Sequence, residues 1–274
     1  AAVVSQLEGF EAAAGSWETE LIPARVAGYE PHWLDDLCRA GRVVWTRLEA
    51  PKTDSSRAQG SSPVRSTPIT LLTRKNLPVW TALAKTAELP SPPGRRGGDE
   101  GKDATTSSSA QSGLWRLSSR AQSVVNFLTQ YGASFFDDIT EGLDQPRTFI
   151  EDALRELTAA GLINSDGFSG LRALLLPADR RKPIGGGRRR RTAVFGVEDA
   201  GRWALIRRKP ARSDGATALA REAATALARE TAEHIARTLL KRYGVIFWRM
   251  LAREADWLPP WRELLMACRR LETR

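Results

Sequence analysis

The sequence predicts a helix-rich α+β fold of tandem winged-helix domains with a small β-hairpin module between them. First, residues 117–176 contain three amphipathic helical segments followed by an alternating, glycine-bearing tail. Second, residues 32–48 repeat the end of that order as a short helix, a glycine and a strand. Third, residues 216–273 repeat its beginning with three helical segments. A winged helix has this order of elements, so we expect three such units along the chain.

The first unit, residues 1–89, is expected to be a winged-helix-like domain with an additional strand and helix. Its short helix at 32–39 ends at a glycine, and the branched and aromatic residues of 42–48 favour a strand. A second strand is expected at 67–74 and a helix at 76–89. One face of the short helix is apolar and holds Trp33, Leu34, Leu37 and Cys38.

Residues 90–116 are rich in Pro, Gly and Ser with charges of both signs, which is typical of a flexible linker. The central winged helix follows at 117–176. Its third helix has an apolar stripe at helical spacing. We expect the first wing strand to begin at Leu162, the chain to turn at 165–170, and the second wing strand to return at 171–175.

The C-terminal third is expected to contain a basic connection and a further helical unit. Residues 177–212 are predicted to form a basic linker and a β-hairpin, with strands at 192–197 and 201–208. Residues 213–274 are predicted to form a truncated third winged-helix-like domain. Its helices are expected at 216–243, 245–254 and 261–273. Because residue 1 is not Met and the helical pattern runs to the last residue, we expect a piece of a longer protein.

The net charge of +9 is unevenly distributed. The central winged helix has 4 basic and 8 acidic side chains, whereas residues 177–212 have 12 and 3. Positive charge is therefore concentrated in connections, where a polyanion can bind or where it is simply solvated.

Most catalytic classes lack their motifs here. Gly101-Lys102 is followed by Asp103, so no phosphate-binding loop is present. His32 and His234 are the only histidines, and no His/Cys cluster has metal-ligand spacing, so we expect no metal site. No apolar run is long enough to span a membrane. The two isolated cysteines indicate reduced thiols and a cytoplasmic protein.

The third helix of the central unit is one candidate for contacting DNA. Arg147 and Arg155 on its polar face would donate to phosphates, but Glu151 and Asp152 share that face. The helix therefore serves either as a weak DNA contact or as a structural or protein-contact element. Arg172 of the expected wing is a further candidate for a phosphate contact.

The strongest candidates for DNA binding lie in the basic connection. Each phosphate that a cation neutralises makes binding more salt-dependent. Trp203 can stack on a base or fill a small core, and both readings stay open. The candidates in this connection are Arg188, Arg189, Arg190, Arg191, Arg202, Trp203, Arg207 and Arg208.

The amino-acid sequence of several segments resembles the C-terminal region of long bacterial Lhr (large helicase-related) proteins, a branch of the superfamily 2 DNA helicases. The resemblance covers most of the chain except residues 51–66 and 90–112. The segments that carry it are WLDDLCRAGRVVWTRL (33–48), ASFFDDITEGL (133–143), ALRELTAAGLINSDGFSGLRALL (153–175), GRWALIRR (201–208) and LLKRYGVIFWRMLAREADWLPPWRELLMACRRLETR (239–274).

This resemblance implies a parent ATP-dependent helicase that uses ATP and Mg and unwinds DNA in repair. The family's ATPase half has no counterpart in these residues, so no cofactor is expected in this segment. The C-terminal half of the family is similar to winged helices plus a small β module, and to a family of DNA glycosylases with a Gln-x-Gln motif. No two glutamines lie two residues apart here.

The leading hypothesis is a DNA-binding accessory region of a repair helicase, with single-stranded or forked DNA as the partner. One alternative is a glycosylase-like module that excises damaged bases, which needs a buried carboxylate or a Gln pair facing a groove. Another is a winged-helix scaffold for self-association. No membrane partner is expected.

Overall fold

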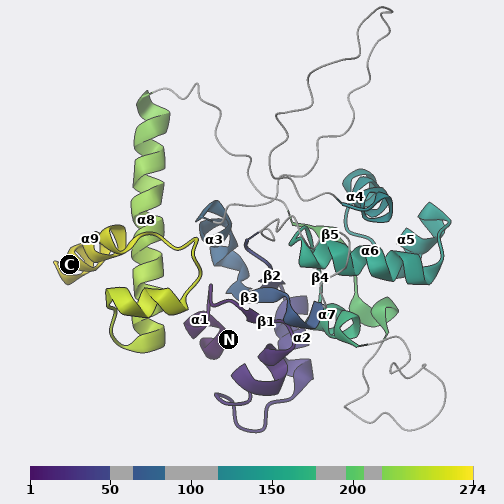
Figure 1. Cartoon of the computed structure of the whole chain (residues 1–274), viewed down its shortest axis with the longest axis horizontal. Helices are drawn as coiled ribbons and strands as arrows, with labels where there is room; N and C mark the ends of the chain where they lie inside the picture. Colours follow the sequence, from purple (N-terminus) through teal and green to yellow (C-terminus); the bar gives the residue numbers. More distant parts are fainter. Residues whose placement is uncertain (50–63, 84–116, 177–195, 207–217, 274) are drawn as a thin grey trace, which may run out of the picture.

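The structure, a computed structural model, describes residues 1–49, 64–83, 117–176, 196–206 and 218–273 (Figure 1). Its helices are α1 (Ala2–Gln6), α2 (Pro31–Arg39), α3 (Leu77–Leu83), α4 (Ser119–Tyr131), α5 (Phe136–Leu143), α6 (Arg147–Ala159), α7 (Phe168–Leu175), α8 (Ala218–Tyr243) and α9 (Trp261–Glu272). Its strands are β1 (Ala12–Ala13), β2 (Val43–Thr46), β3 (Pro68–Thr73), β4 (Ile163–Ser165) and β5 (Trp203–Leu205). Shorter helical turns are η1 (Trp17–Leu21), η2 (Val64–Ser66), η3 (Arg74–Asn76), η5 (Val197–Ala200) and η6 (Trp248–Arg253).

The first unit has the winged-helix arrangement that the sequence predicts. Its three antiparallel strands lie in the order β1-β3-β2, with Val43 opposite Thr73 and Ala12 opposite Ile69. Pro31 occupies the first turn of α2, where its missing N–H is not needed. The sequence pattern does not reveal strand β1. In the chain, this strand lies between α1 and α2.

The central unit repeats this plan. The antiparallel strands β4 and β5 pair, and Ser134 between α4 and α5 forms a bridge to Trp203 of β5. Strand β5 therefore lies in the middle, as β3 does in the first unit. Ser118 caps α4 by accepting a hydrogen bond from Ala121 N, which fixes where the first helix of the unit begins.

The expected wing of the central unit is wrong in one respect. Residues 168–175 form helix α7, not a returning strand, because Phe168, Leu171 and Leu174 are buried along one helical face. The partner of β4 is β5, from the expected separate hairpin. Residues 192–195 and 207–208 of that hairpin lie outside the described residues. In the described residues, β5 therefore shares a sheet with β4 and contacts the turn between α4 and α5.

One hydrophobic core runs through both units. It joins residues such as Trp17 and Trp45 of the first unit to Leu154 and Phe168 of the second. The indole Nε1 of Trp45 donates to the carbonyl of Gly167 at 3.0 Å. Helix α7 packs against α2, so the enlarged connection between β4 and β5 attaches one winged helix to the other.

The C-terminal helices form a second core against the opposite part of the first unit. Figure 1 shows α8 and α9 on one side of β2 and β3, with α4–α6 on the other. Ile235 and Leu239 of α8 and Leu264 of α9 pack with Val44 and Trp80. The expected helices at 216–243 and 261–273 are present as α8 and α9, whereas the segment expected at 245–254 is only the 3-10 turn η6.

Candidate nucleic-acid interface

Arg147 is the first residue of α6 and its side chain is half exposed. Its guanidinium lies 2.8 Å from Asp137 Oδ1 and 3.5 Å from Glu198 Oε2, and it also covers the ring of Phe136. The charge of Arg147 is therefore balanced by protein carboxylates. A phosphate has to compete with them.

The other charged side chains on the exposed face of α6 form ion pairs with one another. Arg155 donates to Asp152 Oδ1 at 2.7 Å and to Glu151 Oε2 at 3.1 Å. These i, i+3 and i, i+4 pairs hold the guanidinium along its own helix. Helix α6 thus presents little free positive charge to a polyanion.

Arg172 does not face solvent, which corrects its expected role as a phosphate contact. Helix α7 directs it into the junction with the first unit, where Nε lies 2.6 Å from Glu18 Oε2 and Nη1 lies 3.1 Å from Asp35 Oδ2. Burial alone would lower the pKa of Arg172, but these two carboxylates raise it above its ordinary value. Tyr29 donates to Glu18 at 2.7 Å and completes the network.

Trp203 is wholly buried, at 0% exposure, so the expectation that it stacks on a base is wrong. It is the central-strand residue that pairs with Ser134 and Ser165. Its neighbour Arg202 is exposed and forms an ion pair with Asp166 at 2.9 Å. Arg188–Arg191, Arg207 and Arg208 lie outside the described residues.

The fold brings together three cations that sequence reasoning did not select. Arg42 opens β2, while Arg74 and Lys75 follow β3, and all three are exposed. Arg74 N donates to Arg42 O at 3.0 Å, and the Arg74 side chain lies beside Gly41 at the end of α2. Within the described part of the chain, none of the three forms an ion pair.

We call this group of exposed cations the strand-end cluster (Arg42, Arg74 and Lys75). Like charges on adjacent strand ends repel one another. The nearby Glu8 carboxylate is engaged by Thr73 and Asn76, and the three cations have no ion pair among the described residues, so the cluster favours an anionic partner. Only the antiparallel register of β2 and β3 brings residues 42 and 74 together, which is why the linear sequence gave no signal for them.

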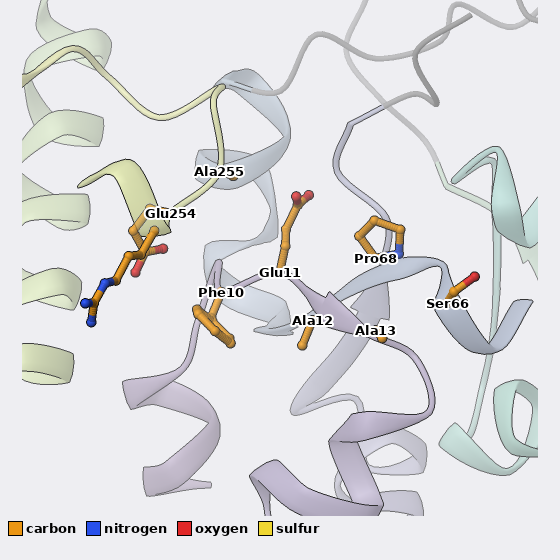
Figure 2. A pocket seen from close by; sticks show the side chains of 9 residues that line it. Phe10, Glu11, Ala12, Ala13, Ser66, Pro68, Glu254 and Ala255 are labelled. Carbon is orange, nitrogen blue, oxygen red and sulfur yellow. The ribbon is translucent and has the colours of Figure 1, made fainter. Parts of the chain in front are cut away.

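A cavity of about 280 Å³ lies where β1 meets the loop after η6 (Figure 2). Figure 2 shows Glu11 extending between Phe10 and Pro68, with Glu254 on the opposite wall. Trp257 Nε1 donates to Glu11 at 3.2 Å. The residues that line the cavity are Phe10, Glu11, Ala12, Ala13, Ser66, Pro68, Arg253, Glu254 and Ala255.

Burial raises the pKa of Glu11 above its ordinary value, and the nearby carboxylates of Glu49 and Asp256 raise it further. The Trp257 hydrogen bond and the Arg47 guanidinium act in the opposite direction. A carboxyl group with a raised pKa in a partly apolar cavity is suited to donate a proton.

Among the described helices, none combines the length and the hydrophobicity that a transmembrane span requires. In the same part of the chain, no group of three or more His, Cys, Asp or Glu side chains is arranged to hold a metal ion.

Two stretches of the chain match known winged-helix families. Residues 1–71 match the third winged-helix domain of the large helicase-related protein, and residues 225–274 match the fourth. The chain is also similar to a protein of Escherichia coli (strain K12) named "Lhr helicase/uracil glycosylase", with 41% identity over 44 residues. That similarity covers 16% of this chain and 3% of the relative. The two family matches flank the central unit.

Proposed function

We propose that this chain is a DNA-binding accessory region of an ATP-dependent helicase that acts in DNA repair, because residues 1–71 and 225–274 match winged-helix domains of the large helicase-related protein. In this proposal another part of a longer, cytoplasmic protein supplies the motor that hydrolyses ATP with Mg. The partner is single-stranded or forked DNA, and self-association of the region is compatible with it.

The observation that carries the proposal is the strand-end cluster, which is exposed and lacks described acidic partners. Winged helices position cations against a nucleic-acid backbone through helix ends and strand ends, and such contacts supply affinity without reading sequence. Arg147 and Arg202 support this role less strongly because carboxylates already hold them.

Arg188–Arg191 add a second group to the proposal. In the sequence they lie between α7 and β5, outside the described residues. Four consecutive arginines concentrate positive charge, and each phosphate that a cation neutralises adds to the salt-dependent affinity. Arg207 and Arg208 directly follow the described residues 196–206.

The salt dependence of DNA binding tests this function. Substitution of Arg42, Arg74 and Lys75 by Gln should weaken binding and reduce the slope of log affinity against log salt by roughly 2–3, because each lost phosphate contact removes about 0.7–0.9. Substitution of Arg188–Arg191 should reduce the slope by a similar or larger amount.

The matched control is Arg25→Gln, which removes an exposed cation that donates to its own helical turn. Its affinity and slope should stay close to those of the unaltered chain. Unchanged slopes in both multiple variants contradict the proposal, as does an unaltered chain that fails to bind DNA.

A second candidate function is base excision, which the Glu11 cavity favours. The similar Escherichia coli protein carries uracil glycosylase in its name. In this proposal a base enters the cavity, protonated Glu11 donates its proton to the departing base, and water adds to the sugar carbon as the glycosidic bond breaks. The carboxylate is then reprotonated by the proton that the water releases.

Release of uracil from a uracil-containing oligonucleotide tests this second function. Glu11→Gln should lower the rate by about 10²-fold or more, the contribution typical of a positioned acid. Glu20→Gln, which alters an exposed carboxylate, is the control. Equal rates in Glu11→Gln and the unaltered chain exclude Glu11 as the acid, and no release by the unaltered chain excludes the activity.

A further inference from the structure

Two consecutive aromatic residues, Phe247 and Trp248, are exposed in the segment between α8 and α9. Phe247 is 51% and Trp248 62% exposed, at the start of η6. The guanidinium carbon of Arg249 lies 5.3 Å from the centroid of the Trp248 ring. In this trio, the aromatic platform (Phe247, Trp248 and Arg249), the guanidinium lies over one face of an indole that is 62% exposed.

The exposure of Trp248 is not needed to build the fold. Trp17, Trp45, Trp80 and Trp203 are each no more than 1% exposed and fill the cores. Within η6 itself, Met250 is buried and anchors the turn, so the inward position is already occupied. The outward aromatic pair therefore leaves apolar surface in water, which a stable fold by itself does not require.

Positive charge dominates the sequence that leads into the platform and through η6, and acidic residues return at Glu254 and Asp256. From residue 237 to 253 the chain has five cations and no carboxylate. Arg242 is buried and donates to Glu254, and Lys241 donates to Ser5. Arg249 and Arg253 remain exposed on η6, and Arg253 also lines the Glu11 cavity.

We propose that the aromatic platform stacks on bases of single-stranded nucleic acid while Arg249 and Arg253 contact the adjoining phosphates. This inference rests on the proposed DNA-binding function and names a site for it. Stacking needs a free base face, which single strands offer and an intact duplex does not, and sites of this kind combine aromatic rings with cations. Aromatic rings and arginines are also enriched at protein interfaces, so contact with a second copy of the chain is the competing outcome of the test.

Binding of the full 274-residue chain to a labelled oligothymidine tests the platform. Trp248→Ala should weaken binding by about 5-fold to 140-fold, the range for loss of one stacked base. Trp248→Phe should retain most of the affinity because a ring remains. Tyr131→Ala is the matched control: Tyr131 is 64% exposed on α4 and should have no effect.

An abasic oligonucleotide of equal length separates stacking from phosphate contact. It should bind the unaltered chain and Trp248→Ala with equal affinity. Arg249→Gln should weaken the binding of both oligonucleotides. If the unaltered chain binds oligothymidine but Trp248→Ala binds equally well, the platform is overturned and the DNA-binding function stands. If the unaltered chain binds no DNA, both fail. Sedimentation tests whether the platform is instead a contact between copies of the chain. If the chain self-associates and a platform variant dissociates it without changing its DNA affinity, the platform serves self-contact and the stacking proposal is overturned.

Discussion

Arg172 in α7 and Asp35 in α2 are 3.1 Å apart between Nη1 and Oδ2, although they come from different winged-helix units. Asp35 Oδ1 also accepts a hydrogen bond from Ser169 N at 2.7 Å, at the start of α7. One carboxylate thus holds both the helix and its arginine. The connection between β4 and β5 is attached to the first unit by charge as well as by apolar packing.

Loss of Arg172 should destabilise the protein strongly. Arg172→Ala leaves the buried carboxylates of Glu18 and Asp35 without their cation, so the free energy of unfolding should fall by about 3–5 kcal/mol. Urea denaturation measures this change. Arg39→Ala, which breaks an exposed pair with Asp36, should change it by less than about 1 kcal/mol. Equal effects of the two substitutions contradict the buried network.

Trp203 should matter for folding and not for DNA affinity. Trp203→Ala removes a fully buried ring and should lower the free energy of unfolding by about 3–5 kcal/mol. The milder Trp203→Phe should bind DNA with unchanged affinity, as measured by fluorescence anisotropy. Trp248→Ala, at a position that is 62% exposed, is the stability control. A loss of DNA affinity in a folded Trp203→Phe chain argues against a purely structural role.

The contact between Gly9 and Trp80 should tolerate no side chain. Gly9 has φ of 79°, and a Cβ there would lie 2.2 Å from Cζ3 of the Trp80 ring. Gly28 has a similar φ of 63° but open space around it. Gly28→Ala should therefore lose only about 1–2 kcal/mol of stability through backbone strain, and Gly9→Ala distinctly more. Thermal denaturation of both variants measures the steric contribution as their difference; similar midpoints contradict the close contact.

Acid should remove the stability that the Glu8 carboxylate contributes to the fold. Burial raises the pKa of this carboxyl, but the His234 side chain, 3.4 Å away, and hydrogen bonds from Thr73 and Asn76 outweigh burial and lower the pKa below its ordinary 4.5. Because the folded pKa lies below the unfolded one, Glu8 contributes stability above about pH 4.5 and loses it as the pH falls through the folded pKa.

The measurement is the free energy of unfolding against pH in the unaltered chain and in Glu8→Gln. The unaltered chain should lose stability more steeply below pH 4.5 than the variant. Glu20→Gln, at an exposed carboxylate, should follow the unaltered chain. Parallel curves for Glu8→Gln and the unaltered chain would show that Glu8 is not preferentially ionised in the folded protein.

Arg147 and Arg202 show which properties of a candidate site the sequence predicts and which it does not. Arg202 and Arg147 are exposed as expected, but each is held by a carboxylate that lies 10 or more residues away in the chain. Sequence spacing identifies cations without identifying their partners. Arg42 and Arg74 illustrate the converse, since their proximity depends on a strand pairing that joins distant residues.

The sequence by itself determined the positions of α2, α6, α8 and α9 and the order of a winged helix, because helical periodicity and glycine stops are local properties of the chain. Only the tertiary structure decided that β4 pairs with β5, that α7 replaces a wing strand, and that Trp203 and Arg172 lie inside. Those outcomes depend on which distant segment satisfies an unpaired strand edge or a buried charge. Local periodicity carries no information about that choice, and packing against the first unit settles it.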